Sequence, residues 1–235
     1  MNKPRLAKTS GIALAVCLAG LGLAACSESS GAGGPIIAEN GYAIDVLELD
    51  GSTDLGIAPA AQIEPAEQST IEFWVSAGWT SDPGFDPVIV SNPGDAGVSY
   101  LVAIDRDRDG LVVAAGEDMD AAPFDFSDGK MHHVGLIDYG DAVTVLVDDE
   151  VIAQMPLSFV PMESEGLYFG SLNGGEERFV GQIGAFRQWD VALGADKVRQ
   201  YRLLDVTAAD NPHPDLEHLA VISDFGNDRV VYIGE

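Results

Sequence analysis

The sequence predicts an all-β fold in which two antiparallel sheets pack as a jelly-roll sandwich, with one short helix near the C-terminus. From residue 36 onward, apolar and polar residues alternate over short runs, as in strands that bury one face. Gly, Asp, Asn and Pro interrupt these runs roughly every eight to twelve residues, which is typical of turns between strands. The chain has 46% hydrophobic residues, so it can bury a core, and this excludes an acidic disordered chain.

The expected elements follow one another along the chain. In residues 69–76, Ile71, Phe73 and Val75 fall on one face of a strand. A helix is expected at residues 194–201, where apolar residues recur at helical spacing. Two final strands are expected on either side of a tight turn. The other strands are expected at residues 98–104, 111–115, 131–137, 142–147, 151–155, 166–170 and 179–189, and the final two at 219–223 and 229–233.

The N-terminus has the features of an export signal. Residues 1–8 carry basic side chains, and residues 11–22 form an apolar run shorter than the roughly 20 residues of a membrane-spanning helix. The tetrapeptide at residues 23–26, Leu-Ala-Ala-Cys, resembles the bacterial lipobox. We therefore expect residues 1–25 to be a lipoprotein signal peptide and Cys26 to carry the lipid. The alternative is a simple secretory signal.

The segment after the cysteine predicts how the protein is attached to the membrane. Residues 26–35 are rich in Ser and Gly and form a lipidated tether rather than a packed segment. Bacterial lipoproteins that this chain resembles use an aspartate directly after the cysteine to stay in the inner membrane. Ser27 stands at that position, so we expect the protein to be lipid-anchored in the bacterial cell envelope, in the outer membrane.

The charge of the chain excludes one class of partner. Twelve Lys and Arg residues stand against 38 Asp and Glu residues, which gives a formal net charge of −26. Such a surface repels nucleic-acid phosphates and attracts cations. We therefore expect no nucleic-acid partner.

Six motifs in a fixed order make a family recognisable. Their sequences are LELDGS at residues 47–52, STIEFWV at 69–75, DGKMHHV at 128–134, VLVDD at 145–149, LYFGS at 167–171 and FVGQIGAFRQWD at 179–190. This series resembles the laminin-G-like domain of the concanavalin A-like jelly-roll superfamily, which includes pentraxins and many bacterial sugar-binding modules.

The resemblance implies the domain organisation and the roles of several aromatic residues. It implies a jelly-roll domain over residues 36–205, and we expect residues 206–235 to add edge strands to the same domain. Phe73, Trp74, His133 and Trp189 are interpreted as packing residues.

Three functions are compatible with this sequence. The resemblance favours a lectin-like module that recognises a glycan or another envelope or extracellular polymer. The alternatives are a structural lipoprotein that binds a protein partner in an envelope complex, and a carbohydrate-active enzyme of the same fold. We expect no enzymatic activity, because the Glu-x-Asp-x-x-Glu pattern of retaining glycosidases and a nucleophile elbow are both missing. Glu176 and Glu177 are expected to lie in a solvated turn.

Calcium is the only cofactor that the residues suggest. Asp105, Asp107 and Asp109 alternate before a glycine, which is a pattern able to gather carboxylates around a hard cation. The alternative is a solvated turn in which the two intervening arginines partly neutralise the acids. Acid-rich loops are also expected at residues 81–86, 117–120 and 125–128, but none of their residues is assigned as a ligand.

Overall fold

The computed structural model describes residues 36–37, 43–225 and 229–232. The expected signal peptide of residues 1–25, the lipidated Cys26 and the tether of residues 26–35 lie outside these described residues. None of the described helices is long and apolar enough to cross a membrane.

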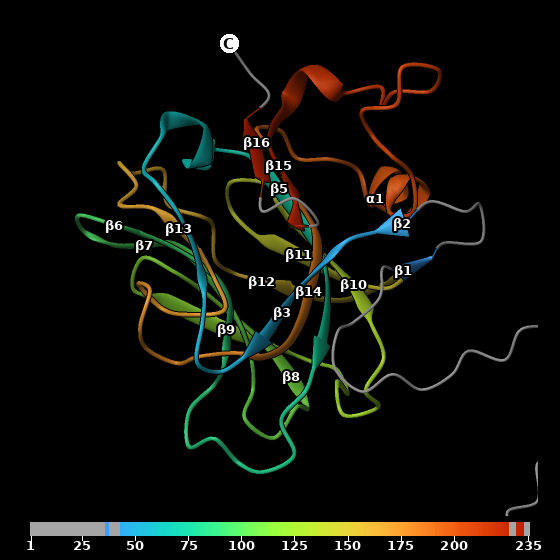
Figure 1. The fold of residues 1–235 in the computed structure, drawn as a ribbon. Helices are drawn as coiled ribbons and strands as arrows, with labels where there is room; N and C mark the ends of the chain where they lie inside the picture. Colours follow the sequence, from blue (N-terminus) through green and yellow to red (C-terminus); the bar gives the residue numbers. More distant parts are fainter. Residues whose placement is uncertain (1–35, 38–42, 226–228, 233–235) are drawn as a thin grey trace, which may run out of the picture. The chain divides into compact units, whose positions relative to one another are not determined.

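The first of two large sheets has six antiparallel strands in the order β4-β13-β6-β7-β8-β9 (Figure 1). Consecutive strands β6 to β9 form a meander, because each pairs with the next along the chain. The strands are β4 (Leu55–Ile57), β6 (Val88–Gly94), β7 (Gly97–Ile104), β8 (Gly110–Ala115), β9 (Asp118–Pro123) and β13 (Leu167–Phe169).

The second sheet has eight antiparallel strands in the order β12-β11-β10-β5-β14-β15-β16, and β3 also pairs with β14. The short strands β1 (Ile36–Ile37) and β2 (Ala43–Ile44) form a separate pair. The eight strands are β3 (Val46–Asp50), β5 (Ser69–Ala77), β10 (His132–Asp138), β11 (Val143–Val147), β12 (Glu150–Met155), β14 (Val180–Trp189), β15 (Leu219–Asp224) and β16 (Arg229–Tyr232).

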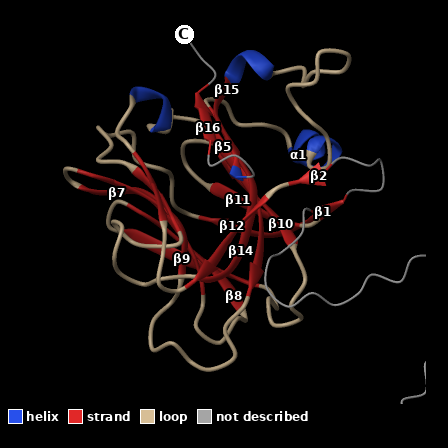
Figure 2. Ribbon diagram, in the orientation of Figure 1, coloured by secondary structure: helices blue, strands red, loops and turns tan. Residues whose placement is uncertain are grey.

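Only a small part of the described residues is helical, as Figure 2 shows. The helix α1 (Ala195–Tyr201) lies where the sequence predicts a helix, and two short 3₁₀ turns, η1 (Ala61–Ile63) and η2 (Leu216–His218), accompany it. The two antiparallel sheets and the short helix confirm the predicted fold class.

Three strands of the six-stranded sheet, β4, β6 and β9, were not expected from the sequence. Strand β6 begins with a continuous apolar run, which shows no alternation because both of its faces are covered. Strand β9 includes most of the acid-rich segment 117–120, so the prediction of a loop there is wrong. Its exposed and half-buried acids are accommodated because β9 is the edge strand of the sheet.

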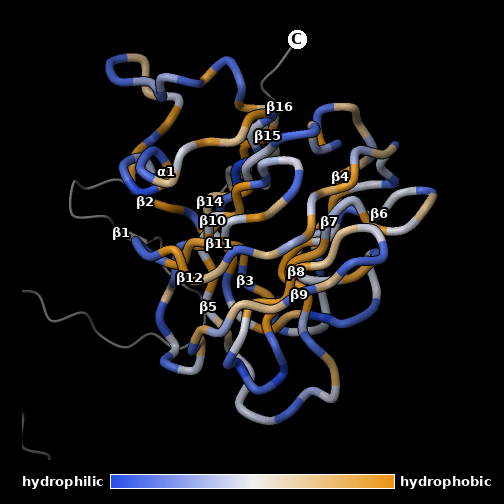
Figure 3. Tube along the Cα trace, turned by 180° about the vertical axis from the view of Figure 1, so that it is seen from behind, coloured by the Kyte–Doolittle hydropathy of each residue, from blue (hydrophilic) through white to orange (hydrophobic). Residues whose placement is uncertain are grey.

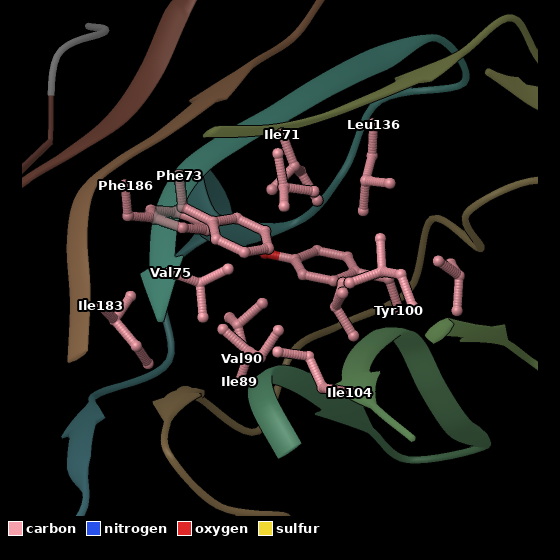
Figure 4. Close-up of a cluster of buried hydrophobic side chains, with 14 of the residues drawn as sticks. Ile71, Phe73, Val75, Ile89, Val90, Tyr100, Ile104, Leu136, Ile183 and Phe186 are labelled. Carbon is pink, nitrogen blue, oxygen red and sulfur yellow. The ribbon is translucent and has the colours of Figure 1, made fainter. Parts of the chain in front are cut away.

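The core lies between the two sheets. Figure 4 shows Phe73, Ile183 and Phe186 of the larger sheet facing Tyr100 and Ile104 of the smaller sheet. All five are fully buried, and the hydroxyl of Tyr100 donates a hydrogen bond of 2.8 Å to Gln188. Along the described residues, hydrophobic stretches follow the strands and the connecting loops are mostly hydrophilic (Figure 3). Ile71 and Val75 are also buried here, so the predicted inner face of β5 is confirmed.

A β-bulge in β14 changes which side chains face the core. The pairing of β14 with β5 shifts between Gly184 and Arg187, and Ala185 has a positive φ of 45°. Ile183 and Phe186 therefore both face the core although they are three positions apart. Before the bulge β14 pairs with β3, and after it β14 pairs with β15.

Residues 190–218, which we call the cap, cover the middle of the outer face of the eight-stranded sheet. Leu193, Val198 and Val206 of the cap pack with Trp189 in a second apolar cluster. Gly135 of β10 allows this close approach, because a Cβ there would lie 2.9 Å from Val198 Cγ1. As a result, all nine residues of β5 are buried, including those on its outer face.

A charged cluster is buried beneath the cap. Glu72, 1% exposed, accepts a hydrogen bond of 3.0 Å from Trp189 Nε1 and lies 3.4 Å from Nη1 of Arg187 and 3.3 Å from Nε2 of His133. Arg187 donates in turn to the backbone carbonyls of Tyr201 and Leu204 in the cap, at 3.1 and 2.7 Å. Burial acts to raise the pKa of Glu72, but Arg187, His133 and Trp189 outweigh it and hold the pKa at about 2.

This cluster confirms the packing roles predicted for the aromatic positions of the motifs. Trp74, His133 and Trp189 are 9%, 1% and 0% exposed. His133 differs in one respect from a fully satisfied imidazole, since its Nδ1 has no hydrogen-bond partner among the described residues.

Candidate ligand-binding groove

The outward face of the six-stranded sheet carries a row of small and apolar side chains. The strand register aligns Tyr168 with Ser91, Ser91 with Leu101, Leu101 with Ala114, and Ala114 with Met119. Met119 ends this row on the edge strand and is 72% exposed. The row therefore leads from the middle of the sheet to an accessible methionine.

A groove of about 410 Å³ lies on this face. Its floor is formed by alternate residues of β7 and β8, whose other neighbours along each strand point into the core. Phe85 and Met119 add larger apolar side chains. The floor residues are Leu101, Ala103, Val112 and Ala114, and the remaining residues of the groove are Gly84, Asp86, Arg106 and Glu177.

One part of the groove is fixed by an ion pair between two loops. The loop of residues 78–87 connects β5 to β6, and residues 105–109 connect β7 to β8. Asp86 accepts a hydrogen bond of 3.1 Å from the backbone N–H of Arg106, and its carboxylate lies 3.6 Å from Nε of the same residue. Arg106 is the one basic residue among the described residues that line the groove, and its side chain lies beside Asp86.

Glu177 places a second carboxylate in the groove. It is half-buried, has a positive φ of 48°, and its backbone carbonyl accepts a hydrogen bond of 2.9 Å from Val88. Partial burial, followed by repulsion from Asp86 and Glu176, raises the pKa of the Glu177 carboxyl. The segment is a turn, as expected, but Glu177 is only partly solvated because the 171–177 segment folds back against β6.

This combination suits a ligand that has both an apolar face and polar groups. An apolar floor with one aromatic ring can pack against C–H groups, while carboxylates accept hydrogen bonds from hydroxyl or amino groups. Perturbed carboxyl groups within a groove are also a common property of functional sites.

The predicted calcium residues lie in the β7–β8 hairpin, outside the floor of the groove. The Asp105 carboxylate accepts a hydrogen bond of 2.8 Å from the backbone N–H of Asp107. The backbone carbonyls of the hairpin are also engaged: Trp79 Nε1 donates to Arg106 O, and the N–H groups of Phe126 and Phe124 donate to the carbonyls of Arg108 and Asp109.

This hairpin does not show the convergence of oxygens that calcium requires. Among the described residues, no group of three or more His, Cys, Asp or Glu side chains is placed to hold a metal ion. Calcium takes six to eight oxygen ligands. The residues present do not fit such a site, and calcium binding by Asp105, Asp107 and Asp109 stays a prediction that titration can test.

Comparisons with known proteins agree with the architecture. The family profile of the concanavalin A-like lectin/glucanases superfamily matches residues 50–199. No curated protein matches the chain in sequence.

Three solved structures share the fold at low sequence identity. A candidate carbohydrate binding protein from Bacteroides ovatus ATCC 8483 has a TM-score of 0.52 and 19% identity over 76% of this chain, which spans only 52% of that structure. The Ruminococcus gnavus IT-sialidase CBM40 bound to α2,3 sialyllactose has a TM-score of 0.52 and 13% identity, covering 66% of this chain and 96% of the module. Domain 4 of AbnA, a GH43 extracellular arabinanase from Geobacillus stearothermophilus in complex with arabinotriose, has a TM-score of 0.53 and 14% identity, covering 71% and 79%.

Proposed function

This chain belongs to the concanavalin A-like lectin/glucanases superfamily, and on that premise we propose that it is a lectin-like module that binds a glycan or a related polymer. The groove on the outer face of the six-stranded sheet carries this proposal. It offers an apolar floor, the ring of Phe85 and two carboxylates in one place. The similar structures that hold sialyllactose and arabinotriose support the class of ligand.

We propose binding without catalysis. Asp86 and Glu177 are the two acids of the groove among the described residues, and Asp86 is paired with Arg106. The two acids come from different loops, whereas the acids of retaining glycosidases of this fold follow one another on one strand. Incubation with the oligosaccharides that bind should therefore release no shorter products.

We further propose that the module acts while attached to a membrane. The lipobox-like sequence before Cys26 would supply the anchor, and the Ser/Gly-rich residues 26–35 would let the domain stand away from the bilayer. Ser27 directly after the cysteine supports the outer membrane as the location, in the cell envelope of a bacterium.

A glycan array tests the proposed function. The domain of residues 36–235 is compared with its Phe85→Ala and Tyr139→Ala variants. Phe85 lines the groove, whereas Tyr139 is an aromatic residue, 40% exposed, in the turn after β10. We expect Phe85→Ala to weaken every specific signal by about five-fold or more, since stacking against an aromatic ring contributes about 1 kcal/mol. Unchanged signals in Phe85→Ala, or none in the parent domain, would contradict the proposal.

One observation favours a protein partner as the second candidate function. Met119 is highly exposed on an edge strand beside an apolar floor, and exposed methionines adapt well to protein surfaces. A photo-crosslinking residue at position 119 distinguishes the two functions. Crosslinks to one discrete envelope protein, together with an empty glycan array, would replace the glycan proposal with this one.

A further inference from the structure

The charge balance of the groove indicates which glycan it would accept, and this inference rests on the proposed function. Two carboxylates, Asp86 and Glu177, line the groove together with one guanidinium, Arg106. Because Arg106 is already paired with Asp86, it does not offer a free cation to a ligand. The net charge of the chain, −26, adds to the negative potential.

Glu177 is the group in this groove that lacks a counter-charge. No ion pair among the described residues includes its carboxylate, and its neighbour Arg178 is committed to Asp54 at 2.7 Å. Partial burial and the nearby Asp86 and Glu176 raise the pKa of Glu177, which means that its negative charge is poorly compensated. A cation brought by a ligand would compensate it.

The shape of the groove limits which cation can supply this compensation. A hard metal ion would need several converging oxygens, and the described residues provide no such group. The floor of Leu101, Val112 and Ala114 instead presents an apolar surface beside the acid. A ligand that satisfies both features has a flat C–H face and a protonated amine on one molecule.

We infer that the groove is selective for amino sugars with free amines, such as a deacetylated glucosamine polymer. The sugar face packs on the floor against Phe85, and the ammonium group pairs with Glu177. Glycans that carry carboxylates or sulfates are rejected, because they would place a further negative charge beside Glu177, which has no counter-charge among the described residues of the groove.

Calorimetric titration with two oligosaccharides of equal length tests this selectivity. The probes are the hexamers of glucosamine and of N-acetylglucosamine, in a mildly acidic buffer where the amines are protonated. We expect the glucosamine hexamer to bind about five-fold more tightly, which corresponds to about 1 kcal/mol for one partly exposed ion pair. The difference should shrink with added salt.

Two variants separate a local effect from general attraction to an acidic protein. Glu177→Gln should abolish the preference, so that the two hexamers bind with equal affinity. Glu217→Gln removes the same charge from the cap, where the side chain is 83% exposed, and should keep the preference. Loss of the preference in both variants would show that only the overall charge matters, and would overturn the inference.

The outcomes also distinguish this inference from the proposed function. Equal or tighter binding of the acetylated hexamer overturns the amine selectivity, and the function survives if Phe85→Ala weakens that binding. Binding of neither hexamer also overturns the selectivity. In that case, Phe85-dependent signals for other glycans on the array would keep the proposed function, and an empty array would end it.

Discussion

Replacing Arg187 with methionine should destabilise the domain more than most single substitutions. Arg187 is 1% exposed and links Glu72 in the sheet to two carbonyl groups of the cap. Methionine fills a similar volume without the charge, so the main effect is an uncompensated buried carboxylate. Removing one partner of a buried ion pair costs about 3 to 5 kcal/mol of the free energy of unfolding. This is a large part of the about 5 to 15 kcal/mol typical of a domain.

Urea denaturation followed by tryptophan fluorescence measures this loss. The control is the double variant Glu72→Gln/Arg187→Met, in which the buried charge is removed together with its partner. We expect the double variant to be more stable than Arg187→Met alone, because the glutamine introduced at position 72 can still accept the hydrogen bond from Trp189 Nε1. A loss of less than about 1 kcal/mol in Arg187→Met would refute the view that this ion pair fixes the cap.

The same cluster predicts a dependence on pH. The ordinary pKa of Glu72 is 4.5 and its folded value is about 2, so its contribution to stability is present above pH 4.5 and is lost as the pH falls towards 2. Without Arg187 the folded pKa of Glu72 should rise. As the pH falls from 4.5 towards 2, Arg187→Met should therefore lose less additional stability than the parent domain. An equal loss in both proteins would contradict the view that Arg187 lowers the pKa of Glu72.

Three further predictions concern packing, lipidation and calcium. Trp189→Ala should cost about 3 to 5 kcal/mol of the free energy of unfolding, because the indole is fully buried beneath the cap; a near-neutral result in the same urea assay would contradict that burial. Cys26→Ser should abolish labelling with a lipid precursor, whereas Cys17→Ser, inside the expected signal peptide, should not; detergent partitioning that persists without Cys26 would refute the lipobox interpretation. If Asp105, Asp107 and Asp109 bind calcium, a hundred-fold excess over Kd should add about 2.7 kcal/mol and raise the melting temperature, and Asp107→Asn should remove this shift. Magnesium at equal ionic strength controls for screening, and equal responses to both ions would leave a solvated turn.

The alternation of apolar and polar residues was enough to predict most strands, because most strands bury one face against the other sheet. It was less informative for β5, where the cap buries the outer face as well, so that Glu72 is as buried as Phe73. The covering segment lies more than a hundred residues away in the sequence, and no local pattern can reveal such a contact.

The groove could not be predicted from local sequence for a related reason. Phe85, Leu101, Met119 and Glu177 lie in four separate segments. The register of the six-stranded sheet aligns Leu101 with Met119 across Ala114, and two loops add Phe85 and Glu177. One signal was present in the sequence of β7, where Leu101 and Ala103 add apolar side chains to the outward face. A strand that is apolar on both faces indicates either a covering layer or a surface for a ligand.

The position of β5 at the centre of its sheet determines when the domain can fold. Its two neighbours are β10, which begins at His132, and β14, which begins at Val180. Neither pairing is a local hairpin, and closing such long loops makes folding slow. A chain that is synthesised from its N-terminus must therefore carry β5 unpaired until β10 has followed, and with one open edge until β14 has followed. Until then, the open edges and the apolar face of β5 can pair with other unfolded chains and aggregate. The yield of folded protein should therefore depend strongly on chaperones that bind unfolded chains.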